Sequence, residues 1–399
     1  MVTLIRNLAI IAILVFSFGC KTEISEQEFL RAASDELSRI KSASYYMVSS
    51  SSAPGDTMKF SEPRKRYVKI FVNPGDTVVG VSSMLFPGDD TTRMTDFYDG
   101  IVRGTVSWDK MSITVDSFRN DPYPFRLVHY PFYPRINEIL KYALTTEDSI
   151  RTDFQDFGDS VHYRLQVINK HVYFHLKPIV IQNEYIPEDE ISQFDIWFDS
   201  SDKLPFRMRS KWHHTTLFEE CYGVRLNTAS EVRFISTDYF PEGFEVRQFK
   251  RNATVEKPDL TGKVAPNWIL HDADNQVVEL NELNYKVILL QFTGIGCGPC
   301  HMALPFLNEL VAEYRDKSFR FVSIETWSRN SEGIRRYKAN NDLNYNMLLS
   351  TDQVTKDYLV NSVPVFFILD EHKKIIKVIN GYSKGTTDKE IRSAVEKQL

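Results

Sequence analysis

The sequence has few cysteines, no excess of basic residues and no visible repeat or low-complexity tract. Its four cysteines are Cys20, Cys221, Cys297 and Cys300. Because Cys20 lies in an N-terminal leader and the last two share one motif, no disulfide scaffold can form, and the fold must be held by hydrophobic cores. A formal net charge of -5 and a pI near 6.0 give no electrostatic footprint for nucleic acid, so DNA and RNA are not expected partners.

The first residues have the pattern of an export signal. Asn7 to Phe18 is almost wholly apolar, too short for a comfortable membrane span but suited to the core of a signal peptide. The string "SFGC", which ends at Cys20, resembles the lipidation site of bacterial lipoproteins. The resemblance implies a signal peptide over residues 1–19 and a lipidated Cys20 that holds the chain on the inner or outer membrane, facing the periplasm. An uncleaved anchor helix is the alternative, and it also exports the remainder.

The remaining length of about 380 residues predicts two domains. Apolar residues at helical spacing predict an amphipathic helix from Ile24 to Lys41, and a second helix is predicted from Ile136 to Leu144. Short β-branched or aromatic runs dominate between and after them: "RKRYVKIFV", "TVVGVSS", "IVRGTVSW", "MSITVDSF", "HYRLQVIN", "HVYFHLKP", "FDIWFDS", "FRMRSKW" and "EVRFIS". Such a series predicts a mainly antiparallel sheet that is too large to stay flat and curls around a helix, as a curved sheet or half-barrel.

One phrase in this β-rich region, "FDIWFDSSDKLPFRMRSKW", resembles the lipoprotein-carrier-like half-barrels. The similarity covers roughly Tyr45 to Lys250. It implies an open sheet that holds a lipid, another apolar ligand or a segment of a partner protein. An unrelated β-sandwich is the alternative.

A polar, proline-containing run from Arg251 predicts a domain boundary near Pro258, so we expect a β-rich domain over residues 20–257 and a second domain over residues 258–399. Helices and strands alternate in this second domain. The predicted strands are "KVILLQF", Phe319 to Glu325, "NMLL", Val365 to Leu369 and Ile375 to Ile379, and the predicted helices are Cys300 to Tyr314, Ser331 to Ala339, Asp352 to Tyr358 and Thr387 to Gln398. This order predicts an α/β sheet with helices on both faces.

The stretch "QFTGIGCGPCHMALPF" permits two interpretations. Cys297 and Cys300 have the spacing of a redox dithiol, and with His301 they also form Cys-x-x-Cys-His, the attachment signature of a c-type haem. Three segments decide between them: "KVAPNWIL", "LLQFTGIGCGPCHMALP" and "VPVFFILDEHKKIIKVINGY". Over Gly262 to Leu399 they resemble the membrane-tethered, thioredoxin-like family of TlpA and ResA type, which favours the redox dithiol.

The resemblance implies a role for each residue of the motif. Cys297 would lie at a helix N-terminus, where unpaired N–H groups stabilise a thiolate, and would be the attacking thiol. Cys300, one turn into the helix, would be the resolving thiol that closes the disulfide and expels the partner. The dipeptide Gly298 and Pro299 is that of general reductases rather than of strong oxidants.

The segment "SVPVFF" matches the cis-proline of the family. The resemblance implies that Pro364 faces the dithiol and that the backbone of Val363 pairs with a bound peptide. An ordinary trans proline before a strand is the alternative. The chemistry needs no cofactor, but it needs a protein disulfide as substrate and an electron donor, for which we expect a membrane-embedded protein of the disulfide-relay type. The implied enzyme is a thiol-disulfide oxidoreductase, more specifically a protein-disulfide reductase.

The sequence departs from the family pattern at three positions. Gln291 stands where thioredoxins carry a buried aspartate, Ala303 where the tethered family usually carries glutamate, and Gly296 where a tryptophan is common. Since neither Gln291 nor Ala303 can take a proton, we expect water or another base to do so. Glu325 is our candidate for that base, with a plain surface glutamate as the alternative.

The remaining candidate groups point to structural roles. Cys221 is expected to be a buried thiol, with a regulatory role as the alternative. His171 and His175 are expected on one face of a strand, and neither they nor the pair His213 and His214 lie near an acid cluster, so no metal site is predicted. A non-enzymatic carrier or scaffold, in which the second domain merely docks, is the alternative function.

Overall fold

The computed structural model describes residues 25–53, 56–119, 126, 128–182, 186, 188–212, 215–228, 234–250 and 259–399. The predicted leader with Cys20, the pair His213 and His214, and the predicted domain boundary near Pro258 lie outside these residues. The helices are α1 (Glu26–Ser38), α2 (Phe132–Thr145), α3 (Gly298–Met302), α4 (Leu304–Glu313), α5 (Ser331–Asn340), α6 (Asp352–Asp357) and α7 (Thr387–Glu396). Among the described residues, none of these helices has the length and apolarity that a membrane span requires.

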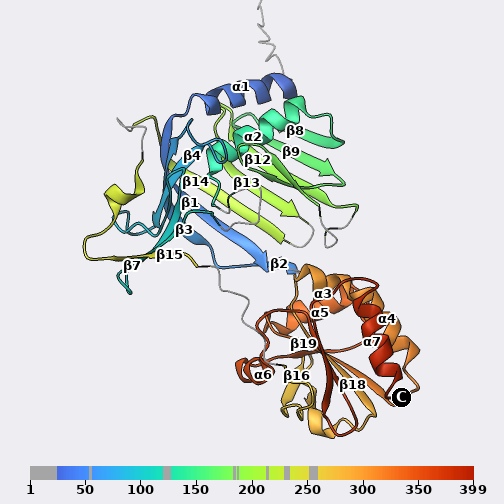
Figure 1. Ribbon diagram of the computed structural model, residues 1–399. Coiled ribbons are helices and arrows are strands. Elements are labelled where there is room, and N and C mark those ends of the chain that lie inside the picture. Colours follow the sequence, from blue (N-terminus) through green and yellow to red (C-terminus); the bar gives the residue numbers. More distant parts are fainter. Residues whose placement is uncertain are drawn as a thin grey trace, which may run out of the picture.

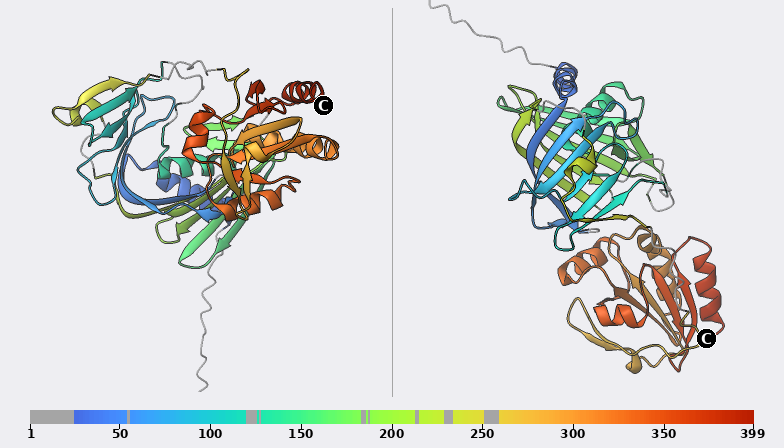
Figure 2. Two further views of the ribbon diagram at one scale, coloured as in Figure 1. Left: turned by 90° about the horizontal axis from the view of Figure 1, so that it is seen from below. Right: turned by 60° about the vertical axis from the view of Figure 1, so that its left-hand side comes forward.

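One large, curved sheet dominates the described chain before residue 251 (Figures 1 and 2). Its strands are β1 (Ser42–Ala53), β2 (Asp56–Phe60), β3 (Arg64–Val72), β4 (Val81–Pro87), β5 (Asp96–Tyr98), β6 (Arg103–Ser107), β7 (Ser112–Asp116), β8 (Ile150–Asp156), β9 (Ser160–Ile168), β12 (Ile191–Asp199), β13 (Pro205–Trp212), β14 (Thr215–Leu226) and β15 (Glu245–Gln248). The order is β15-β7-β6-β5-β4-β3-β1-β14-β13-β12-β9-β8, with β2 paired to β1. Only β15 pairs in parallel within this described sheet. A separate hairpin joins β10 (His171–Phe174) to β11 (Pro178–Ile181).

The helices α1 and α2 pack against one face of this sheet, as the prediction of a sheet curled around a helix requires (Figure 1). Phe29 of α1 and Ile136 of α2 belong to one apolar cluster with residues of β1, β9, β12 and β13. The two helices also contact each other through Ser34, whose hydroxyl donates to the Asn137 amide oxygen over 2.8 Å. Because the helices fill this apolar face, a lipid would have to share it with their side chains. The lipid-ligand hypothesis stays a prediction.

Several predicted elements in this region have different bounds in the structure. The first helix is shorter than predicted and ends at Ser38, while the second starts earlier, at Phe132, directly after Pro131 in an extended conformation. The predicted strand over residues 231–236 is wrong where it is described: residues 234 and 235 are irregular, and Ser236 begins a 3-10 helix, η1 (Ser236–Tyr239). The strand β10 ends before His175, so His171 and His175 do not share one strand.

The region after residue 258 is an α/β fold of thioredoxin type (Figure 1). Its strands are β16 (Ile269–Asp272), β17 (Val277–Glu279), β18 (Val287–Thr293), β19 (Phe319–Glu325), β20 (Met347–Leu349), β21 (Val365–Leu369) and β22 (Ile375–Asn380). They pair in the order β17-β16-β20-β19-β18-β21-β22, with β18, β19 and β20 parallel to one another. Every residue of β18 is buried, because apolar clusters cover both faces of the sheet. Side chains of α4, α5 and α7 cover one face, and Val354 of α6 belongs to the cluster on the other.

The long helix predicted from Cys300 to Tyr314 is wrong, because the chain forms two helices there. The helix α3 ends at Met302 and α4 begins at Leu304, with Ala303 between them. Pro305 lies in the first turn of α4. If α3 continued into α4 as one helix, Pro305 would lack the N–H that donates to the preceding turn, and its ring would clash with the carbonyl group of that turn. The break therefore separates the motif helix from the longer helix that packs on the sheet.

Candidate active site

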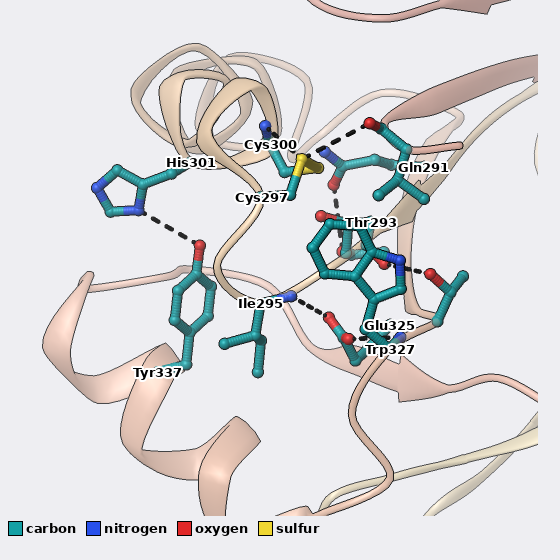
Figure 3. Close-up of a disulfide and its surroundings, with 12 residues drawn as sticks. Gln291, Thr293, Ile295, Cys297, Cys300, His301, Glu325, Trp327 and Tyr337 are labelled. Atoms are coloured by element: carbon teal, nitrogen blue, oxygen red, sulfur yellow. Dashed lines mark hydrogen bonds between the residues drawn. A yellow bond between two sulfur atoms is a disulfide. The ribbon is translucent and has the colours of Figure 1, made fainter. Parts of the chain in front are cut away.

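Cys297 and Cys300 form a disulfide where the loop after β18 enters α3 (Figure 3). Their Cα atoms are 5.2 Å apart. Cys297 is the N-cap of α3, and its Sγ accepts the backbone N–H of Cys300 over 3.2 Å. Cys297 keeps 5% of its surface exposed and Cys300 only 1%. The pair thus has one sulfur at a helix end and one beneath it, an arrangement suited to an attacking and a resolving thiol.

The loop before Cys297 takes its shape from two glycines. Gly296 has a φ of +89°, a left-handed conformation that disfavours the tryptophan common in the family at this position. At Gly294, a Cβ atom would lie 2.4 Å from the indole ring of Trp327, so the ring rests directly on the loop backbone. Trp327 itself is 58% exposed. The structure therefore places an indole beside the motif from the end of a different strand, and this was not predicted from the sequence.

Glu325 ends β19 and is almost fully buried, which excludes the alternative of a surface glutamate. Its carboxylate accepts three backbone N–H groups, from Ile295, Trp327 and Ser328, each over 2.8 Å (Figure 3). Burial raises the pKa of Glu325 to about 7, although the three hydrogen bonds act in the opposite direction. The carboxylate therefore connects the loop that carries the motif to the loop that carries Trp327.

Gln291 lies on β18 and is 1% exposed. It pairs in register with Ser323 of β19, whose hydroxyl donates to the Gln291 Oε1 over 3.2 Å. Figure 3 draws the Gln291 side chain next to the disulfide. The position where thioredoxins carry an aspartate is thus occupied by a neutral amide. Ala303, at the other departure from the family, is fully buried between α3 and α4.

The remaining predicted site residues lie close to the disulfide. The peptide bond between Val363 and Pro364 is cis, as the family resemblance implied. The carbonyl oxygen of Val363 is 3.6 Å from the Cys297 sulfur. Gly298 and Pro299 form the first turn of α3 and are partly exposed. The loop of Val363 and the start of α3 thus border the sulfur that is closer to solvent.

Other groups named from the sequence lie outside this arrangement or at its edge. His301 Nδ1 is 3.4 Å from the Tyr337 hydroxyl of α5, at the rim of the motif. Cys221 on β14 is a buried free thiol, as predicted, and burial raises its pKa strongly. His171 is buried, with Nδ1 3.5 Å from the Glu190 carboxylate, which fits a structural role.

Comparisons with known proteins cover the region that holds this site. Residues 260–396 match the family described as Redoxin. Over 129 residues, 32% of this chain and 74% of the relative, the chain is 27% identical to the thiol-disulfide oxidoreductase ResA of Bacillus thuringiensis. The ResA of Bacillus cereus is 28% identical over 127 residues, 32% of this chain and 72% of that protein. The C-terminal third of the chain is therefore a Redoxin domain of the thioredoxin-like, thiol-disulfide oxidoreductase class, which confirms the predicted family and enzyme class.

Solved structures of similar proteins cover the same region. One is a putative thiol-disulfide interchange protein DsbE from Chlorobium tepidum, with 22% identity, a TM-score of 0.33, and coverage of 35% of this chain and 96% of that one. Another is StoA from Bacillus subtilis, with 18% identity, a TM-score of 0.29, and coverage of 33% of this chain and 98% of that one.

Proposed function

We propose that the protein is a lipid-anchored, extracytoplasmic disulfide reductase that uses Cys297 and Cys300 as its redox pair. The single observation that carries this proposal is the placement of the two sulfurs, one capping α3 beside the Val363 carbonyl and the other buried beneath it. The similarity to the ResA enzymes supports the same chemistry. The lipid anchor and the periplasmic location are proposed from the N-terminal sequence, namely the apolar run Asn7 to Phe18 and the string "SFGC".

The reaction runs in two exchanges. The Cys297 thiolate attacks a protein disulfide, forms a mixed disulfide and releases one substrate thiolate. The Cys300 thiolate then attacks the Cys297 sulfur, closes the disulfide and releases the second substrate thiolate, so two electrons pass to the substrate. A dithiol donor, for which we propose a membrane-embedded protein of the disulfide-relay type, restores the reduced pair. Val363 and Pro364 would border the bound peptide, and Glu325 is our candidate for a nearby base.

A trapping experiment tests the reductase proposal. Cys300→Ser cannot resolve the mixed disulfide, so we expect this variant to accumulate covalent adducts with disulfide-bonded proteins, while Cys297→Ser should accumulate none. The wild-type pair should have a reducing potential of roughly -270 mV, near that of thioredoxin. Absence of adducts with Cys300→Ser would exclude the reductase and favour the alternative, a non-enzymatic scaffold in which this domain only docks.

The membrane anchor and the β-rich region are tested separately. Cys20→Ser should abolish acylation, measured by mass spectrometry of the N-terminal peptide, and release the chain from the membrane fraction. For the β-rich region we propose recruitment of a partner protein or an apolar ligand. Crosslinking of the trapped adduct should then recover contacts in the curved sheet as well as at the motif, whereas contacts confined to residues 259–399 would contradict recruitment.

A further inference from the structure

Gln291 carries a buried hydrogen-bond donor, its side-chain amide nitrogen. Its Oε1 accepts the hydroxyl of Ser323, but its Nε2 is buried and has no hydrogen-bond partner among the residues that the structure describes. Most buried side-chain donors in proteins are paired, because an unpaired one loses its water without compensation. A nearby group that becomes an acceptor in another state of the protein would satisfy this donor.

The position of Gln291 limits which groups can accept a hydrogen bond from its Nε2. Along β18 its side chain alternates with Leu290 and Phe292, which belong to the cluster on the other face, so it projects toward α3 and α4. On that face its cross-strand neighbours are Ser323, which already contacts the amide oxygen, and the apolar Phe366. Figure 3 draws the sulfur of Cys300 next to this side chain. Only the sulfur changes its hydrogen-bonding capacity with redox state, because a disulfide sulfur is a poor acceptor and a thiolate a strong one.

We propose that the Gln291 amide donates a hydrogen bond from Nε2 to the Cys300 sulfur when the Cys297–Cys300 disulfide is reduced. The hydroxyl of Ser323 holds the amide oxygen and so directs the nitrogen toward the sulfur. The proposal rests on the proposed function and deepens it. A carboxylate here would accept the proton of Cys300, whereas the amide stabilises the thiolate after its proton has left. Gln291 is thus a positioning and charge-stabilising residue for the resolving step.

The test is the equilibrium of the full chain with dithiothreitol, in which the protein disulfide is reduced to two thiols as dithiothreitol is oxidised to its cyclic disulfide. Gln291→Leu removes the donor and destabilises the reduced form where Cys300 is ionised. At about pH 9.5, above the ordinary thiol pKa, we expect a roughly tenfold fall in the equilibrium constant, which corresponds to a potential about 29.6 mV more negative. At about pH 7, where the thiol keeps its proton, the fall should be smaller.

Two further variants serve as controls. Tyr345→Phe removes a buried hydroxyl of the same domain that, like the Gln291 amide nitrogen, has no hydrogen-bond partner among the described residues. This variant should leave the equilibrium unchanged. Ser323→Ala leaves the Gln291 amide but removes the hydroxyl that holds its oxygen. We expect a fall in the equilibrium constant that is smaller than with Gln291→Leu and depends on pH in the same way. If Gln291→Leu does not fold, Gln291→Glu replaces the donor by a carboxylate and should shift the equilibrium in the same direction at about pH 9.5.

A shift under about twofold at pH 9.5, or one of equal size at both pH values, would overturn the proposal, since a purely structural residue has no reason to follow thiol ionisation. The adducts of Cys300→Ser do not depend on the Cys300 sulfur. Adducts without a Gln291 effect would therefore refute only this inference, and absence of adducts would refute the reductase itself.

Discussion

Replacing Glu325 should change how the stability of the Redoxin domain depends on pH. The carboxyl group is 1% exposed, and burial raises its pKa from an ordinary value of 4.5 to about 7. The folded state therefore binds the proton more tightly than the unfolded state. Its contribution to stability is complete below about pH 4.5 and is lost as the pH rises through about 7. Because 1 pKa unit corresponds to about 1.4 kcal/mol, the loss amounts to about 3 kcal/mol.

Glu325→Gln provides the comparison, because the amide is isosteric and does not titrate. We would measure amide hydrogen exchange of β18 and β19 peptides in the oxidised full chain, which reports the local opening free energy without requiring the whole chain to unfold in one step. The opening free energy of wild type minus that of Glu325→Gln should fall by about 3 kcal/mol between about pH 4.5 and pH 8. Tyr337 does not interfere, since burial raises its pKa far above this range.

A difference that stays constant within about 0.5 kcal/mol across this range would refute the argument, because it would mean that the three N–H groups offset burial and leave the carboxyl with an ordinary pKa. A constant offset on its own is expected. The amide can accept from only one side, and losing one buried hydrogen bond costs about 1–3 kcal/mol at every pH.

Three further changes have definite expected outcomes. Ala303→Glu restores the family's carboxylate one turn from Cys300 and should accelerate release of the mixed disulfide near pH 7 by up to about 10²; a wild-type rate already fast and flat from about pH 6 to pH 8 would show that proton transfer is not limiting. Gly294→Ala should displace the Trp327 ring, because the ring would lie 2.4 Å from the new methyl group. We expect a change in indole fluorescence and a loss of about 1–3 kcal/mol in stability, and an unchanged spectrum would contradict the contact. Cys221 should resist alkylation until the β-rich region unfolds, as judged by mass spectrometry, and labelling of the folded protein would contradict its burial.

The strands that the sequence predicted best are those buried on both faces. Residues 319–325 and 365–369 have the same bounds in the prediction and in the structure. The second is a continuous apolar run, "VFFIL", and the first, "FRFVSIE", is buried at every residue except Arg320. By contrast, β1 was missed, although it lies between β3 and β14 within the large sheet. Its second half is a run of serines, and only pairing with both neighbours, which the sequence does not reveal, holds it as a strand.

In the site, too, local sequence patterns were predictive, whereas contacts between distant segments were not. Cys297 and Cys300 could be named from sequence because their spacing permits only a redox dithiol or a haem attachment site, and the family resemblance favours the dithiol. Trp327 could not, since its place beside the motif depends on the contact with Gly294, more than thirty residues away in the chain. A small signal was present: a tryptophan two residues after Glu325, where the predicted strand ends, in a chain whose motif lacks the usual tryptophan.

The ionisation of Glu325 affects the motif loop as well as proton transfer. With a pKa of about 7, it changes charge near neutral pH, where the thiols exchange. Its two oxygens accept three backbone N–H groups, and a protonated carboxyl group is a weaker acceptor than a carboxylate, so proton uptake weakens these hydrogen bonds. One of them holds Ile295, two residues before Cys297, and proton uptake is therefore coupled to the motif loop. Glu325→Gln should consequently alter the reactivity of Cys297 toward alkylating reagents together with the rate of exchange, whereas loss of a base that only transfers protons would slow the exchange and leave that reactivity unchanged.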